Sequence, residues 1–131
     1  MKLRILVVDD QEDILQTTAL VLSKGGYDVL TAPIGIEAIE IAQTEHPDLI
    51  LLDIEMPRMD GWEALRLLRL DKTTRDIPVA LFTILFDLRE KVRALKFGAQ
   101  EYITKPFSID DLLSRVGMLL SNASAGEAGA G

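Results

Sequence analysis

The sequence predicts a doubly wound α/β fold, in which a five-stranded parallel sheet carries five helices on its two faces. Five short strand-like runs alternate with helix-like segments along the chain, and this alternation is typical of parallel sheets covered on both sides. The length of 131 residues is that of one domain. The expected strands span residues 3–8, 27–31, 48–53, 77–82 and 101–104.

The polarity of these strands predicts their order in the sheet. Residues 5–8, 49–52 and 79–82 are continuously apolar, whereas residues 27–31 and 101–104 mix polar with apolar side chains. Strands buried on both faces are continuously apolar, so the first, third and fourth strands belong inside and the second and fifth at the edges. This pattern fits the flavodoxin-like order 2-1-3-4-5, which places a ligand crevice between the first and third strands.

The segments between the strands have the spacing and the end signals of amphipathic helices. Apolar residues recur at helical spacing, and we expect these stripes to face the core. Aspartates with a glutamate three residues later have capping-box spacing, and glycines mark helix ends. The stripes include Leu15, Ala19 and Leu22, then Leu88, Val92 and Leu95, and finally Leu112, Val116 and Leu119. The caps are Asp60 with Glu63 and Asp87 with Glu90, and the glycines are Gly25, Gly26 and Gly98.

Composition restricts the partners and the compartment. A net charge of −7 disfavours direct contact with nucleic acid or an anionic membrane. Cysteine is absent, which is compatible with a reducing compartment, and we expect the cytoplasm. The apolar run that follows residues 1–4 is too short for a signal peptide or a membrane span. Residues 121–131 are rich in Ala, Gly and Ser, small residues that cannot pack a core, so we expect a domain over 1–120 followed by a flexible tail or linker.

Five polar residues follow four of the predicted strands: Asp9, Asp10, Asp53, Thr83 and Lys105. The carboxyl ends of parallel strands meet at one edge of a sheet, so these side chains should lie together. Carboxylates placed together raise each other's pKa, which a hard cation such as Mg²⁺ offsets. Beside such a cation, the carboxylate of Asp53 is a nucleophile suited to phosphorus, and Lys105 and Thr83 could hold phosphoryl oxygens.

Four sequence pieces carry a resemblance to a known family. VVDDQ, LLDIEMPRMDG, FT and YITKPF follow successive strands, and with them residues 1 to about 120 resemble response regulator receiver domains. The resemblance implies that Asp53 is the phospho-acceptor and that Asp9 and Asp10 lie beside Mg²⁺, or Mn²⁺ in its place. It also implies that the backbone carbonyl of Glu55 is a further metal ligand and that Lys105 pairs with the phosphoryl group.

The same resemblance implies a conformational switch and its partners. Thr83 would bond the phosphoryl group and Tyr102 would turn inward, which alters the face made by the fourth helix, fifth strand and fifth helix. That face could support a phosphorylation-dependent homodimer. The donor would be a histidine kinase or a histidine phosphotransfer protein, and an output domain could follow the tail. The domain would not be an enzyme beyond its own phosphorylation and dephosphorylation, and Lys105–Pro106 would be a cis peptide.

Three positions depart from the family pattern. Ile84 stands where a small residue is usual, and Glu55 and Leu85 occupy positions that influence loss of the phosphoryl group. We hypothesise that Ile84 and Leu85 shield the acyl phosphate and prolong its life. His46 has no partner at ligand spacing and is expected to be an exposed structural residue, while Pro57, Asp60 and Gly61 should shape the loop and start the third helix.

Three alternatives remain at this point. A phosphatase of the haloacid-dehalogenase kind would want a D-x-D pair, whereas Asp9 and Asp10 are adjacent. A flavodoxin-like FMN carrier would have a first loop rich in Ser, Thr and Gly to receive a phosphate. The third alternative is a receiver-shaped interaction module that is never phosphorylated, for which the bulk of Ile84 is the motive.

Overall fold

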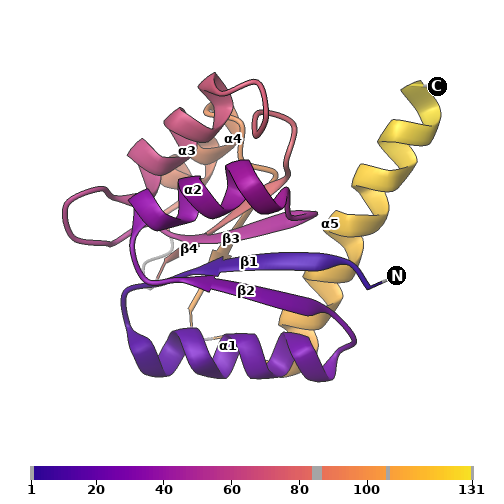
Figure 1. Cartoon of the computed structure of the whole chain (residues 1–131), viewed down its shortest axis with the longest axis horizontal. Coiled ribbons are helices and arrows are strands. Elements are labelled where there is room, and N and C mark those ends of the chain that lie inside the picture. The colour runs from indigo at the N-terminus through magenta and orange to yellow at the C-terminus, as the bar shows by residue number, and fades with distance from the viewer. Residues whose placement is uncertain (1, 84–86, 106, 131) are drawn as a thin grey trace.

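Strands and helices alternate along the described part of the chain, which in this computed structural model comprises residues 2–83, 87–105 and 107–130 (Figure 1). Each of the first four strands begins and ends within two residues of its predicted bounds, and the fifth strand has its predicted bounds. The elements are β1 Arg4–Val8, α1 Glu12–Lys24, β2 Asp28–Ala32, α2 Gly35–Glu45, β3 Leu49–Asp53, α3 Gly61–Leu70, β4 Val79–Thr83, α4 Leu88–Lys96, β5 Glu101–Thr104 and α5 Ile109–Ala130.

The sheet has the predicted topology. Its five strands are all parallel and lie in the order β2-β1-β3-β4-β5. Helices α1 and α5 cover one face, and α2, α3 and α4 cover the other (Figure 1). The strand order changes direction between β1 and β3, and ligands of such sheets bind outside the carboxyl ends of the strands at this point.

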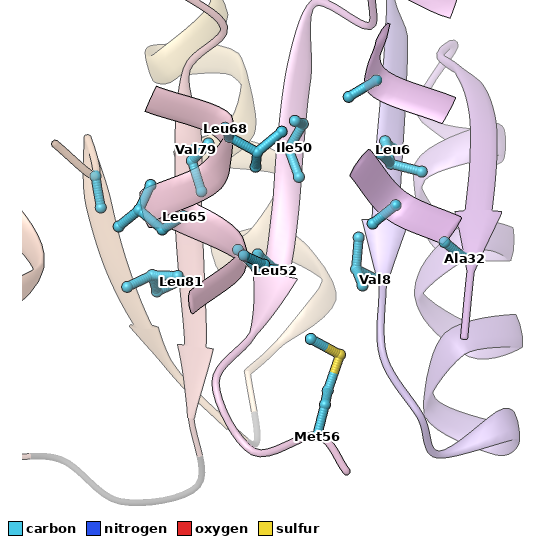
Figure 2. Close-up of a cluster of buried hydrophobic side chains, with 14 of the residues drawn as sticks. Leu6, Val8, Ala32, Ile50, Leu52, Met56, Leu65, Leu68, Val79 and Leu81 are labelled. Carbon is cyan, nitrogen blue, oxygen red and sulfur yellow. The ribbon is translucent and has the colours of Figure 1, made fainter. Parts of the chain in front are cut away.

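Two apolar clusters, one on each face of the sheet, form the core. Successive side chains of a strand point to opposite faces, so Leu6 and Val8 belong to one cluster and Ile5 and Val7 to the other. Figure 2 shows the first cluster, where strand residues meet Leu65 and Leu68 of α3. Because β1, β3 and β4 are buried on both faces, their sequences need apolar residues at consecutive positions.

The helix ends follow the predicted signals. Asp60 accepts a hydrogen bond from the backbone N–H of Glu63 (3.0 Å), and Asp87 accepts one from that of Arg89 (2.9 Å). Gly98 follows α4 with φ of +94°, a conformation that glycine adopts without steric cost. His46 is exposed at the end of α2, as expected.

The predicted core stripe of α4 is wrong. Leu88, Val92 and Leu95 are 65%, 45% and 51% exposed, and Ala94 is the buried residue of this helix. Helical spacing identifies residues that share a face, but it does not say whether another element covers that face. The stripe of α1 has two buried members, Leu15 and Leu22, and the α5 stripe also packs into the core.

The last helix is longer than the sequence indicated. Helix α5 continues to Ala130, and its final turns stand beyond the sheet in Figure 1. Alanine favours helix, so a segment that cannot contribute to a core can still extend an existing helix. The flexibility of residues 121–131 and a domain boundary at residue 120 stay predictions. In the described ranges, neither α5 nor another helix is long and apolar enough to cross a membrane.

Two arginines fasten the carboxyl-terminal end of α4 to α3. The Arg69 guanidinium donates hydrogen bonds to the carbonyls of Gly98 (2.7 Å) and Ile77 (2.8 Å). The Arg93 guanidinium lies 4.2 Å from the centre of the Trp62 ring, within the range of a cation–π contact. These contacts hold the end of α4 that is farther from the connection between β4 and α4.

Candidate functional site

The carboxyl ends of four neighbouring strands bring the five predicted residues to one edge of the sheet. Asp9 and Asp10 follow β1, Asp53 ends β3, Thr83 ends β4 and Lys105 follows β5. Asp9, Asp53, Thr83 and Lys105 are 1%, 5%, 4% and 8% exposed, while Asp10 is open to solvent. A cluster of charged groups buried to this extent needs internal partners.

The three carboxylates form a group that fits a divalent cation. One oxygen from each of Asp9, Asp10 and Asp53 can be chosen so that all three lie within 4.8 Å of one another. Carboxylate oxygens are the ligands that hard cations take, and Mg²⁺ uses few of them because it keeps several waters. The donor set and its one exposed member therefore suit a Mg²⁺ ion that solvent and a phosphate can reach.

Lys105 is shared unequally between two of these acids. Its Nζ lies 2.6 Å from Asp9 Oδ2 and 3.3 Å from Asp53 Oδ1. The other oxygen of Asp9 accepts a hydrogen bond from the backbone N–H of Gln11 (3.0 Å). Asp9 thus has a partner on each oxygen, whereas the contact from Lys105 to Asp53 is the longer of the two.

The electrostatics of Asp53 reflect this crowded setting. Burial raises the pKa of Asp53 from an ordinary 3.8 to about 6; Lys105 opposes the rise, and the charges of Asp9 and Asp10 add to it. The ionised carboxylate is therefore less favourable here than in water. A cation at the three acids would restore the ionised form that a nucleophile needs.

Thr83 connects the site to β5. Its backbone carbonyl accepts a hydrogen bond from the N–H of Lys105 (2.6 Å), and its side chain is hydrogen-bonded to the hydroxyl of Tyr102. Tyr102 is 4% exposed, and burial raises its pKa. The two residues that the resemblance assigns to a switch are thus in contact. Tyr102 already lies inward in this structure, and its movement on phosphorylation stays a prediction.

The loop after Asp53 ends at Gly61, a residue that was not among those predicted for the site. The side chain of Glu55 is exposed, and its carbonyl as a metal ligand stays a prediction, while Met56 points back into the core (Figure 2). Gly61 begins α3 and lies against the backbone of Asp53. Its signal in the sequence was a glycine at a helix start, where alanine would be the better helix former.

Three of the predicted positions lie outside the described residues. Ile84 and Leu85, which we expect to shield the acyl phosphate, are two of them, and Pro106 of the expected cis peptide is the third. The hypotheses on these residues stay predictions.

A cavity of about 390 Å³ opens beside Lys105, between α1 and the start of α5. Its lining is mainly apolar, and its polar groups are the ammonium of Lys105 and the carboxyl and hydroxyl groups of α1. It is lined by Asp13, Ile14, Thr17, Thr18, Val21, Lys105, Phe107 and Ile109. The ring of Phe107 packs on that of Phe82, with 5.3 Å between the ring centres, which supports this wall from the core.

Several solved structures that are similar to this chain are response regulator receiver domains, among them one from Methanospirillum hungatei and one from Francisella. The chemotaxis protein CheY4 of Vibrio cholerae matches with a TM-score of 0.87 at 30% identity, over 91% of this chain and 99% of that one. The sequence model of one protein family, the response regulator receiver domain, matches residues 5–117 of this chain. The chain therefore belongs to the response regulator receiver domain family of two-component systems, which removes the phosphatase and the FMN carrier from consideration.

Curated relatives extend beyond this domain. The chain is 40% identical over 117 residues to the DNA-binding dual master transcriptional regulator RpaA of Synechocystis sp., covering 89% of this chain and 48% of that protein. It is 42% identical over 120 residues to the alkaline phosphatase synthesis transcriptional regulatory protein PhoP of Bacillus subtilis, covering 92% and 49%. The chain thus spans about half the length of these relatives.

Proposed function

We propose that Asp53 accepts a phosphoryl group from the phosphohistidine of a histidine kinase or of a histidine phosphotransfer protein. The observation that carries this proposal is the setting of Asp53, which is buried at the end of an interior strand beside two acids and 3.3 Å from Lys105. It is the acid of the group that has both a buried carboxylate and a long, replaceable contact with the lysine.

In the proposed reaction, an Asp53 carboxylate oxygen forms a bond to phosphorus while the bond from phosphorus to the donor imidazole nitrogen breaks. The electron pair returns to that nitrogen, which then takes a proton. A Mg²⁺ or Mn²⁺ ion held by Asp9, Asp10, Asp53 and the carbonyl of Glu55 would offset the negative charge of the phosphoryl oxygens. Lys105 would keep Asp9 and turn its second contact from Asp53 to a phosphoryl oxygen, as a charge-assisted hydrogen bond.

The signal would leave the site through Thr83. Its hydroxyl is hydrogen-bonded to Tyr102, and a phosphoryl oxygen on Asp53 would compete for that hydroxyl. Exchange of this bond would release Tyr102 to repack under α4. Leu88, Val92 and Leu95 are exposed at helical spacing on α4, and such an uncovered apolar stripe supports the proposed use of the α4, β5 and α5 face for a homodimer or another partner.

The donor would approach from the side of α1 and α5. The cavity beside Lys105 has apolar walls from Ile14, Val21 and Phe107, and a side chain next to the phosphohistidine could occupy it. Such a contact would orient the donor nitrogen, phosphorus and Asp53 in line, and orientation of this kind contributes a large part of phosphoryl-transfer catalysis.

We further propose that the response is transcriptional when this domain is part of a longer protein. RpaA and PhoP are regulators of transcription by name, and this chain matches about half of each. The receiver's charge of −7 disfavours a direct contact with DNA, so a separate DNA-binding segment would make it. The cytoplasm is the proposed location.

The decisive experiment is phosphorylation by acetyl phosphate with Mg²⁺, followed by intact-mass measurement. Wild type should gain one phosphoryl adduct, which should not form when EDTA removes the Mg²⁺. Asp53→Asn should gain no adduct under the same conditions as wild type. If wild type binds Mg²⁺ by calorimetry but gains no adduct, the alternative of an interaction module that is never phosphorylated is favoured. An adduct on both proteins would assign the acceptor to another residue.

A further inference from the structure

Gly61, the first residue of α3, lies directly against the peptide that follows Asp53. A Cβ atom built on Gly61 would be 2.5 Å from the carbonyl oxygen of Asp53 and 2.7 Å from the Cα of Ile54. Both distances are far below van der Waals contact, and both neighbours are backbone atoms. A side chain at this position would therefore displace either α3 or the backbone of the phospho-acceptor.

The local backbone does not explain a glycine at this position. The glycines with positive φ among the described residues are Gly26 and Gly98, so Gly61 lies outside the region that only glycine adopts readily. Within a helix, alanine is favoured over glycine. The contact with Asp53 is the remaining reason, and it acts against the local preference.

The same residue closes the loop that carries the proposed metal ligand. The N–H of Gly61 donates a hydrogen bond to the carbonyl of Ile54 (2.8 Å), and the N–H of Ile54 donates one to the carbonyl of Phe82 (3.0 Å). Within the loop, Met56 is anchored in the core (Figure 2). A shift of Gly61 is thereby transmitted to Asp53 and to the carbonyl of Glu55.

We propose that Gly61 is a positioning residue for phosphoryl uptake, an inference that rests on the function proposed for Asp53. By lacking a side chain, it lets the first turn of α3 support the peptide after Asp53. This support fixes the direction of the Asp53 carboxylate and the place of the Glu55 carbonyl, so that both meet one metal ion and one phosphorus atom.

The chain offers a graded series of glycine-to-alanine variants to test this. Gly61→Ala introduces the 2.5 Å contact with the backbone of Asp53. Gly35→Ala compresses the same loop more gently, because its Cβ would lie 3.1 Å from the Sδ and 3.2 Å from the carbonyl oxygen of Met59. Gly117→Ala is the matched control, since a Cβ there meets no atom within 4 Å.

Three quantities are measured on each variant at a temperature where urea unfolding shows it fully folded: stability, Mg²⁺ affinity by calorimetry, and the rate of phosphorylation by acetyl phosphate at saturating Mg²⁺. We expect Gly61→Ala to lower the rate about ten- to a hundredfold, as a small misplacement of reacting groups does, and to weaken Mg²⁺ binding. Gly35→Ala should be intermediate. Gly117→Ala should equal wild type in Mg²⁺ affinity and in rate, and it should be somewhat more stable, because alanine is favoured over glycine within a helix. Leu68→Val, which loosens α3 at its far end, should lower stability alone.

The proposal is overturned if folded Gly61→Ala keeps a Mg²⁺ affinity and a rate within about twofold of Gly117→Ala. If Gly61→Ala does not fold, the same criterion is applied to Gly35→Ala. If wild type binds Mg²⁺ but takes no phosphoryl group, the proposed function fails by itself. In that case the order of Mg²⁺ affinities across the series still decides whether Gly61 positions the site.

Discussion

Replacing Asp53 by asparagine should make the metal-free protein more stable at neutral pH. Asp53 is ionised there at a cost, because burial together with the charges of Asp9 and Asp10 outweighs the help from Lys105 and raises its pKa from 3.8 to about 6. Asparagine has nearly the same shape and carries no charge. The substitution therefore removes the cost and keeps the packing.

The raised pKa fixes both the sign and the pH range of the effect. Between pH 3.8 and about 6 the folded protein holds a proton on Asp53 that the unfolded chain has released, so stability falls as pH rises through this range. Each pKa unit is worth about 1.36 kcal/mol, which gives an upper limit of about 3 kcal/mol above pH 6. Solvent at the open edge of the site screens these charges, and we expect about 2 kcal/mol.

Urea unfolding of wild type and Asp53→Asn in EDTA, from about pH 4.5 to about pH 7.5, measures this difference. The difference should be small at the acid end and reach its maximum near neutral pH. Adding Mg²⁺ should stabilise wild type more than Asp53→Asn, because the variant has lost one of the three carboxylates. Equal stability of the two proteins at neutral pH in EDTA, or a difference independent of pH, would refute the reasoning.

Three further predictions concern other contacts. Lys105→Met should lose about 3 kcal/mol by urea unfolding, because it leaves the buried carboxylate of Asp9 without its cation; a loss below about 1 kcal/mol would contradict this. Arg93→Ala should cost about 0.5–1 kcal/mol and change the fluorescence of Trp62, the single tryptophan; unchanged emission would mean that the contact does not persist in solution. Leu95→Ser should change the free energy of unfolding by no more than about 0.5 kcal/mol, since Leu95 is 51% exposed. A loss above about 2 kcal/mol would mean that Leu95 is buried in the core, as its helical spacing predicted.

The fold was predictable because each strand's burial leaves a mark in its own sequence. The uninterrupted apolar runs at 5–8, 49–52 and 79–82 belong to strands covered on both faces, and this identified the interior of the sheet. The stripe of α4 was misassigned because its spacing is equally consistent with a covered and an uncovered face. Which face is covered depends on α3 and β5, and the sequence of α4 contains no information about them.

The members of the site were predictable for a similar reason, but their pairing was not. Parallel strands bring their carboxyl ends to one edge, so Asp9, Asp53 and Lys105 had to meet there. Nothing in the sequence indicates that Lys105 lies nearer to Asp9 than to Asp53, because that difference arises from side-chain packing at the edge. The contact of Gly61 with Asp53 was also hidden, since it depends on where α3 begins in space.

The unequal pairing explains how one site could be stable and still ready to react. Asp9, with Lys105 on one oxygen and the N–H of Gln11 on the other, is satisfied by the protein itself and holds the lysine in place. Asp53 has the longer contact with Lys105 and a raised pKa, so its negative charge is less well compensated than that of Asp9. A metal ion or a phosphoryl group can therefore bind Asp53 without breaking the contact between Lys105 and Asp9.

The preference of Lys105 for Asp9 is what leaves Asp53 available. Asp9→Asn should therefore strengthen the contact of Lys105 with Asp53 and lower the pKa of Asp53. NMR titration of the Asp53 carboxyl carbon in EDTA measures this directly, and an unchanged or higher pKa in Asp9→Asn would contradict it.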